Sequence, residues 1–422
     1  MEMMGSWSAV FSLIALLLVL LAGSLLPRIN AGILAIAAAY LVGFLTGTVD
    51  PAGIAKGFPD NLFLMLIGIT LLFAIADKNG TLERITALFL RLARGRAALL
   101  PIIYFFLAVL LSAIGPGNIA AAALLAPSGM ALAVRAGVSP LLMAILICTG
   151  ANAGAFSPVA PTGIISTGLL QKIGIADPLI PLRIFGATAG LQSITALGAV
   201  LLFSDWSTLK HPVPETAHIS RPINRPQWLT IFAIVTLIVL VLVFQLSVGP
   251  VAFVLVAVLW LLGADRHRAS LKDLPWDAIF LLTGIAILIS VLEASGGLTL
   301  LVGLIADISG PHTINAVLAL LTGIASAFSS SSGVIMPAFV PMIPEIMNQT
   351  GVTDPVDLAV AICAGSHMVD VSPLSTLGAL CIASAPVGAE ARSVLFRKLL
   401  LWGLSMALVG AALAFLFLDR PF

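Results

Sequence analysis

The 422-residue chain is too apolar for a soluble fold, because 60% of its residues are hydrophobic, only 9% are charged and its mean hydropathy is +1.15. An ordinary soluble domain is about one quarter charged and about half apolar. The balance of 20 Lys and Arg against 19 Asp and Glu leaves no basic surface for nucleic acid. The three cysteines stand far apart in apolar runs, which excludes a disulfide framework and a metal cluster. Composition therefore predicts an all-α polytopic membrane protein whose partner is the lipid bilayer, with no resident cofactor.

Apolar segments follow one another along the chain, and each is a candidate for the roughly 20 residues that a membrane helix needs. They lie at 8–26, 31–48, 61–76, 97–115, 117–134, 139–170, 183–203, 227–246, 249–263, 277–293, 313–328, 332–347, 356–384 and 394–418. The first apolar segment, 8–26, has no basic residue before it, so we predict a retained membrane span rather than a cleaved signal peptide. Residues 81–96 place four arginines among apolar residues, which predicts an amphipathic helix at the inner interface.

Two pairs of these segments are separated only by short uncharged breaks, Gly115-Pro116-Gly117 and Ser329 to Gly333. We predict that each pair, 97–135 and 313–348, is a re-entrant hairpin, since non-helical backbone is tolerated at membrane depth where protein buries it. About ten transmembrane helices then remain, and 16 of the 20 basic residues fall on one side, as the positive-inside rule requires. This predicts a multi-pass protein of the cell (inner) membrane with both termini outside and a cytoplasmic linker at 205–226.

The two halves of the chain are related by an internal repeat. The stretch TGANAGAFSPVAPTG (149–163) aligns with AGSHMVDVSPLSTLG (364–378) at an offset of 215 residues. Each half holds five crossings and one hairpin, and the odd number predicts that residues 227–422 are inverted relative to residues 1–204. Inverted repeats with broken helices are typical of secondary transporters, with the site at the midplane. The broken spans are expected at 139–170 and 356–384.

Four breaks define the candidate site: the two hairpin tips and the Ser-Pro interruptions of the two broken spans. Proline removes a backbone hydrogen bond, and freed N–H and C=O groups at half-helix ends attract anions and cations, respectively. The breaks and the neutral side chains beside them predict substrate ligands at Gly117, Asn118, Ser157, Pro158, Thr162, Ser331, Ser332, Ser372, Pro373 and Thr376, with Ser375 nearby. No Lys or Arg lies at the breaks, so an anionic substrate needs a bound cation, and sodium accepts oxygen ligands of this kind.

His367 and Asp370 are the ionisable residues at the second broken span, where the first half has Asn152 and Ala155. Ionisable groups inside a membrane are costly and mark functional sites. Their spacing of three residues also allows them to satisfy each other on one helical turn. Proton coupling through this pair therefore stays open beside sodium coupling.

At these residues the chain resembles the ion transporter superfamily, and most of all the MatC-type malonate and C4-dicarboxylate carriers. The stretches GFPDNLFLMLIGITLLFAIADKNGTLERI (57–85) and GVSPLLMAILICTGANAGAFSP (137–158) are similar to the N-terminal signature of that family. In the related divalent-anion/sodium symporters each hairpin tip bears Ser-Asn-Thr. Here GNIAAAALLAP (117–127) and SSGVIMPAFVP (331–341) occupy those places, and Ile119 and Gly333 replace the threonines.

The resemblance implies that the tips bind substrate carboxylate and that carbonyls of the broken spans complete two sodium sites. The cation ligands it implies are Asn118, Gly150, Asn152, Ser331, Ser332, Gly365, His367 and Asp370. It also implies an elevator motion of a mobile domain and a homodimer formed by the scaffold.

Together these observations predict a cation-coupled transporter, with Na+ as the coupling ion and H+ as the alternative, for a small dicarboxylate or related organic anion. A second hypothesis is oxyanion efflux or ion exchange within the same superfamily. A membrane-embedded enzyme would need a nucleophile and a base, and His367 with Asp370 is the one candidate dyad.

Overall fold

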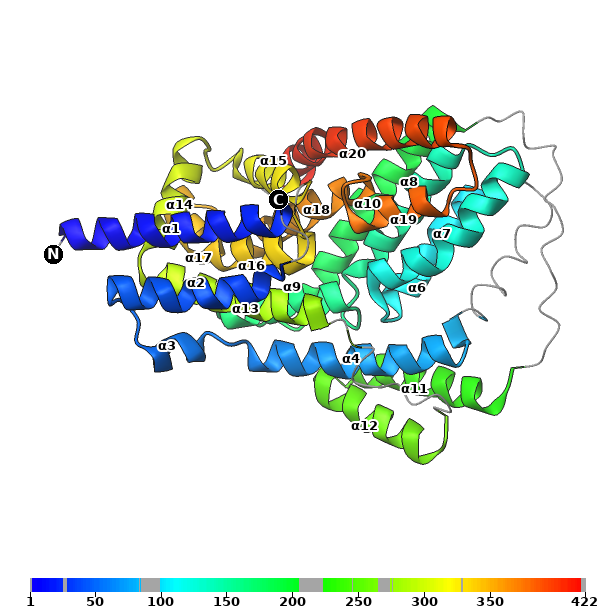
Figure 1. Ribbon diagram of the computed structural model, residues 1–422, viewed down its shortest axis with the longest axis horizontal. Helices are drawn as coiled ribbons and strands as arrows, with labels where there is room; N and C mark the ends of the chain where they lie inside the picture. The colour runs from blue at the N-terminus through cyan, green and yellow to red at the C-terminus, as the bar shows by residue number, and fades with distance from the viewer. Residues whose placement is uncertain are drawn as a thin grey trace.

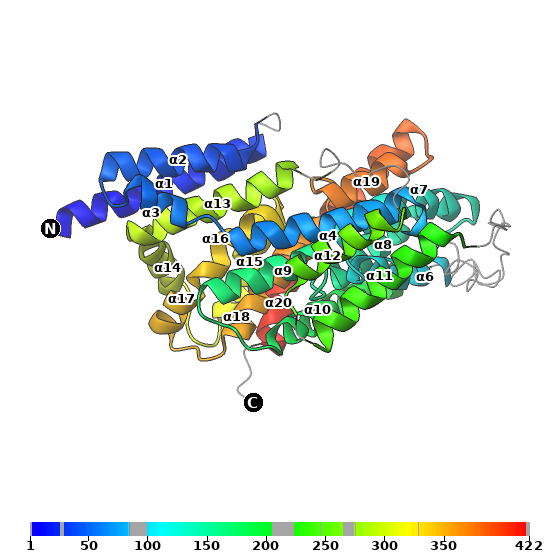
Figure 2. The same cartoon turned by 90° about the horizontal axis from the view of Figure 1, so that it is seen from below.

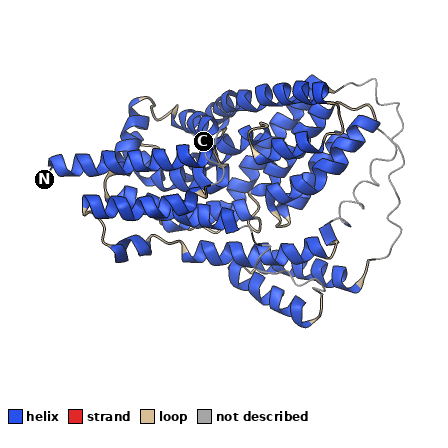
Figure 3. Cartoon of the chain, in the orientation of Figure 1, coloured by secondary structure: helices blue, strands red, loops and turns tan. Residues whose placement is uncertain are grey.

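The computed structural model describes residues 2–25, 29–82, 84, 99–204, 223–244, 246–264, 274, 276–327 and 329–418. Within these ranges all regular secondary structure is helical, and no strand is present (Figure 3). The prediction of an all-α chain is confirmed. The predicted amphipathic helix at 81–96 and the linker at 205–226 fall largely outside the described residues.

The helices correspond closely to the predicted apolar segments. In the first half they are α1 (Glu2–Leu25), α2 (Ala31–Thr46), α3 (Pro51–Lys56), α4 (Asp60–Lys78), α6 (Leu100–Ala113), α7 (Gly117–Arg135), α8 (Pro140–Ala155), α9 (Pro161–Lys172) and α10 (Ile180–Phe203). In the second half they are α11 (Arg225–Leu242), α12 (Val248–Leu261), α13 (Trp276–Ala294), α14 (Gly297–Asp307), α15 (Ile314–Ser326), η5 (Ser331–Ile335), α16 (Met336–Phe339), η6 (Val340–Met342), α17 (Ile343–Thr350), α18 (Pro355–Met368), η7 (Val369–Val371), α19 (Thr376–Ser384) and α20 (Ala389–Phe417). The short helices α3 and α14 were not predicted.

Helix length alone supports fewer spans than the predicted ten. Among the described residues, four helices are long and apolar enough to cross a membrane: α7, α10, the α18–α19 unit and α20. A fifth candidate is the pair α13 and α14, which is bent by 84°. Seven further apolar helices in the described part of the chain have 10–17 residues. The multi-pass membrane character is thus supported, whereas the count of ten spans stays a prediction.

Helices α1, α2, α4 and α13 run along the long axis of the molecule, whereas α6, α7 and α8 lie oblique to it (Figure 1). Helices α1, α2 and α13 pack together, and α4 packs with α11 and α12 in a second group. Figure 2 shows α4, α11 and α12 side by side along one face. The hairpin helices and the broken spans form the rest: α6 and α7 pack on α8, and α15 packs on α18. The halves also interlock, because α19 packs on α7 and α9 contacts η6.

Glycines at equivalent places of the two halves allow the hairpins to approach the broken spans closely. A Cβ atom on Gly150 of α8 would lie 2.5 Å from the carbonyl oxygen of Phe105 in α6. A Cβ atom on Gly365 of α18 would lie 2.5 Å from the carbonyl oxygen of Ala319 in α15. Each glycine thus lets a hairpin backbone rest directly on the helix that is about to break.

Candidate functional site

The first hairpin turns at Gly115-Pro116-Gly117, as predicted from its sequence. Gly115 and Gly117 have φ values of 135° and 82°, in a region that other residues rarely adopt. A Cβ atom on Gly117 would lie 3.1 Å from Pro161 Cδ, so the tip rests against the start of α9. This turn buries the first residues of α7, including Asn118, which is 7% exposed.

Asn118 begins a chain of hydrogen bonds that joins the first hairpin to both broken spans. Its amide Nδ2 donates to Asn152 Oδ1 in α8 over 2.8 Å, and the amide of Asn152 donates to the carbonyl oxygen of His367 in α18 over 2.7 Å. Asn152 is fully buried. The first predicted tip residue and two predicted residues of the broken spans therefore meet at one place.

The second hairpin tip meets the second broken span through Ser331. The turn η5 (Ser331–Ile335) is π-helical, and the Ser330 hydroxyl caps it by accepting from the Gly333 N–H. Ser331 Oγ donates to Asp370 Oδ1 over 2.6 Å, and Ser375 Oγ donates to the same oxygen over 3.3 Å.

Ser326 extends this second network and was missed from the sequence. Its hydroxyl lies 2.6 Å from that of Ser331 and is buried. Nothing except the serine-rich run that follows it signals its role. Asp370 is 5% exposed, and no basic side chain pairs with it among the described residues.

The His367 ring has one satisfied and one unsatisfied nitrogen. Nδ1 lies 2.9 Å from the carbonyl oxygen of Cys363, and because a carbonyl only accepts, Nδ1 carries the hydrogen. Nε2 is buried without a hydrogen-bond partner in the described part of the chain. The ring meets Phe156 edge-on, with centroids 4.7 Å apart. His367 and Asp370 each bond elsewhere, so the dyad required by the enzyme hypothesis is not formed.

Both broken spans are built in the same way. Between α8 and α9, the carbonyl oxygen of Ser157 would lie 2.0 Å from a Cβ atom on Gly163. Between α18 and α19, the carbonyl oxygen of Ser372 would lie 2.2 Å from a Cβ atom on Gly378. The two glycines therefore let the backbone of each break fold over the first turn of the half-helix that follows.

The remaining predicted ligands divide by exposure. Ser157, Thr162, Ser372 and Pro373 are buried at the breaks, and Gly150 and Gly365 lie at the helix contacts described above. Ser332 and Pro158 are half-buried, whereas Thr376 is exposed. Within the described ranges no three His, Cys, Asp or Glu side chains group as a metal site. The polar cores of the site are thus the Asn118–Asn152 and Ser331–Asp370 networks.

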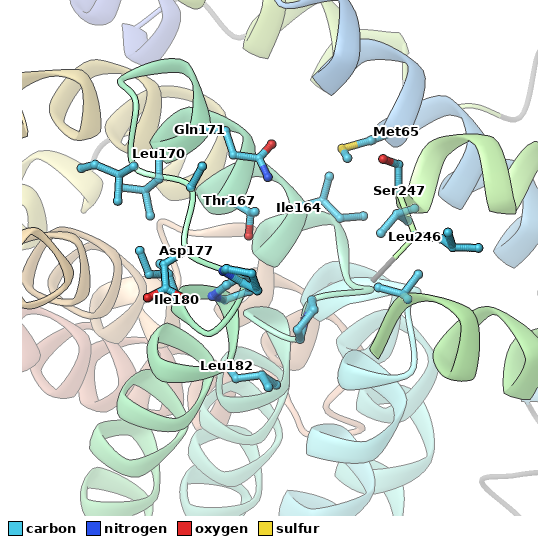
Figure 4. A pocket seen from close by; sticks show the side chains of 17 residues that line it. Met65, Ile164, Thr167, Leu170, Gln171, Asp177, Ile180, Leu182, Leu246 and Ser247 are labelled. Carbon is cyan, nitrogen blue, oxygen red and sulfur yellow. The ribbon is translucent and has the colours of Figure 1, made fainter. Parts of the chain in front are cut away.

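A cavity of about 280 Å³ reaches one of the breaks (Figure 4). Pro158 lines it beside Ile164 and Thr167 of α9. Met65 of α4, the loop residues Leu246 and Ser247 and the first residue of α12, Val248, line its other side. The first break is therefore connected to the space between α9 and the group formed by α4, α11 and α12.

Comparison with known families relates the first part of the chain to one group of carriers. Residues 7–155 match the family model described as the dicarboxylate carrier protein MatC N-terminus. The predicted resemblance to MatC-type carriers is confirmed. The family that this part of the chain matches is one of carriers rather than of enzymes. No curated protein sequence matches the chain.

Solved structures share this fold at low sequence identity. The Alcanivorax borkumensis YdaH transporter has a TM-score of 0.56 and 16% identity over 87% of this chain and 86% of its own. The Neisseria gonorrhoeae protein MtrF, described within a class of antimetabolite efflux pumps, has a TM-score of 0.53 and 14% identity over 88% and 84%. Both matches concern the fold over nearly the full length.

Proposed function

We propose that the chain is a cation-coupled secondary transporter of a small dicarboxylate or related organic anion, with Na+ as the coupling ion. The observation that carries this proposal is the pair of networks in which each hairpin tip bonds to a broken span, Asn118 to Asn152 and Ser331 to Asp370. Discontinuous helices that meet in a membrane protein are the usual binding architecture of secondary transporters. The MatC family model supplies the substrate class.

The chemistry of the site favours binding of a cation together with the anion. The networks offer hydroxyl, amide, carbonyl and carboxylate oxygens, which suit a hard cation. They contain no Lys or Arg, so a doubly charged anion would meet only dipoles and hydroxyls. A cation held by Asp370 would offset part of that charge, because opposite charges attract strongly where water is scarce. Binding of each ion would therefore promote binding of the other.

Alternating access would follow from relative motion of two parts. In this proposal α6–α9 and α15–α19 form a mobile domain that carries the site, and α1, α2, α11 and α12 form a scaffold that dimerises. The two halves would be inverted repeats, and both termini would lie on the outer, non-cytoplasmic side of the inner membrane. Helix α4 packs on α11 and α12 of the scaffold and also contacts α9, so the two parts would slide past each other at the contact of α9 with α4, as in an elevator.

The proposal is tested by uptake of labelled C3 and C4 dicarboxylates into proteoliposomes, with an inward sodium gradient, an inward proton gradient, or neither. Asn118→Ala should abolish uptake, because it removes the amide that joins the tip to Asn152. The matched control is Asn79→Ala, which removes an amide bonded to Thr230 between α4 and α11, away from the breaks. Equal uptake by both variants would show that the tip is not part of the site.

The same assay separates the alternatives. Uptake driven only by protons would assign coupling to Asp370 and His367. Absence of uptake under every gradient would overturn the dicarboxylate proposal and favour oxyanion efflux or ion exchange.

A further inference from the structure

Two of the three cysteines face each other across the boundary between the two halves of the chain. Cys148 lies on α8 and Cys381 on α19, and 233 residues separate them in the sequence. Their sulfur atoms are 3.7 Å apart, and both side chains are fully buried. Helix α19 packs on both α7 and α8 (Figure 1). The third cysteine, Cys363 of α18, is equally buried but belongs to a different apolar cluster.

A disulfide between Cys148 and Cys381 needs only a small movement. The sulfurs of a disulfide are about 2.05 Å apart, so each sulfur must move about 0.8 Å toward the other. Helix α8 is held by α6, α7 and α10, and a Cβ atom on its Gly154 would lie 2.3 Å from the carbonyl oxygen of Val109. Helix α19 has only nine residues, and one of its faces is exposed at Ala379. The movement therefore falls on α19 rather than on α8.

The surroundings of the two thiols restrict which oxidant can reach them. Both lie in an apolar cluster with buried side chains such as Val371 and Leu377. Apolar surroundings exclude a charged reagent, whereas hydrogen peroxide is uncharged and close to water in size. Local opening of a short helix admits a molecule of that size. The class of oxidant that fits the pair is thus a small uncharged peroxide.

One peroxide molecule oxidises one pair of thiols. The first thiol attacks a peroxide oxygen, the O–O bond breaks, and a sulfenic acid and one water molecule form. The second thiol attacks the sulfenic sulfur, so that the S–S bond forms, the S–O bond breaks, and the hydroxide leaves with the thiol proton as a second water. Each sulfur loses one electron, and each peroxide oxygen gains one. Burial makes the first step slow, and the neighbouring thiol at 3.7 Å makes the second fast.

We propose that Cys148 and Cys381 are a peroxide-sensitive pair whose disulfide ties α19 to α8 and weakens the cation site. The connection to that site is Ser375, the N-cap of α19, whose hydroxyl donates to Asp370 Oδ1 over 3.3 Å. This bond is longer than the 2.6 Å bond from Ser331 to the same oxygen, so a small shift of α19 breaks it first. The effect on cation binding rests on the proposed function, whereas formation of the disulfide does not.

The first test detects the disulfide directly. The pure folded protein is treated with hydrogen peroxide and denatured, its remaining thiols are blocked with N-ethylmaleimide, and its peptides are mapped by mass spectrometry without reductant. We expect one linked pair, Cys148 with Cys381, and a free thiol at Cys363. Peroxide added after denaturation should show no such preference, because the unfolded chain does not hold the pair together. Absence of this link in the folded protein, or equal loss of the Cys363 thiol, would overturn the proposal.

The second test measures sodium activation of uptake at constant ionic strength, before and after peroxide. Oxidation should raise the half-saturating sodium concentration about threefold, as loss of one weak hydrogen bond would, and dithiothreitol should reverse the change. Cys148→Ala and Cys381→Ala, which keep Cys363, should not respond to peroxide.

Unchanged sodium dependence in a linked, sodium-driven protein, or the same response in Cys148→Ala, would refute the connection to the cation site. Absence of sodium-driven uptake in the reduced wild type would refute the proposed function instead, and the peptide map would still decide whether the disulfide forms.

Discussion

Asn152 is the residue on which the junction between the two halves depends most. It is fully buried, accepts from Asn118 over 2.8 Å and donates to the carbonyl oxygen of His367 over 2.7 Å. Asn152→Ala deletes both bonds and leaves the buried Asn118 amide without its acceptor, whereas the His367 carbonyl keeps the Val369 N–H. An orphaned buried group costs about 1–3 kcal/mol, so we expect the free energy of unfolding to fall by about that amount.

The assay combines chemical unfolding in mixed micelles with uptake in proteoliposomes. The matched control is Thr149→Val, one turn earlier on α8, because the Thr149 hydroxyl bonds only to carbonyls of its own helix. Thr149→Val should lower the free energy of unfolding by no more than about 1 kcal/mol, because it removes one hydrogen bond and strands no buried donor. If Asn152→Ala were as stable and as active as Thr149→Val, the hydrogen-bonded junction would not hold the site together.

Two further predictions concern the second break. Gly378→Ala should prevent folding or abolish uptake, because its Cβ atom would lie 2.2 Å from the carbonyl oxygen of Ser372. The control is Gly388→Ala, since a Cβ atom on Gly388 would meet no atom within 4 Å. Normal uptake by Gly378→Ala would contradict the described turn. Ser331→Ala should raise the half-saturating sodium concentration about tenfold, because it removes the hydroxyl that orients Asp370. Ser329→Ala serves as its control in the same uptake assay, and equal sodium dependence of the two variants would count against a cation site there.

Local features of the fold were predictable from the sequence because their chemistry has few alternatives. Gly115-Pro116-Gly117 cannot continue a helix, and the structure turns there with two glycines at positive φ. The Ser-Pro interruptions at 157–158 and 372–373 likewise end their helices where predicted. Asp370 was singled out by the cost of a charge in the membrane, and it lies in a buried polar network.

Contacts between distant segments were not predictable in the same way. Asn118 and Asn152 are 34 residues apart, and no pattern in one sequence specifies that their amides bond. Ser326 has no distinguishing signal, because an inward-facing serine near the end of a helix usually bonds to its own backbone. The bond from Ser331 to Asp370 likewise depends on which helices pack together, which hydrophobic periodicity does not encode.

The most direct test of the account is uptake of labelled malonate and C4 dicarboxylates by the pure protein in proteoliposomes with and without an inward sodium gradient. We expect accumulation that requires sodium, is lost in Asn118→Ala and is kept in Asn79→Ala. Dicarboxylate uptake that ignores sodium, or that survives Asn118→Ala, would contradict it.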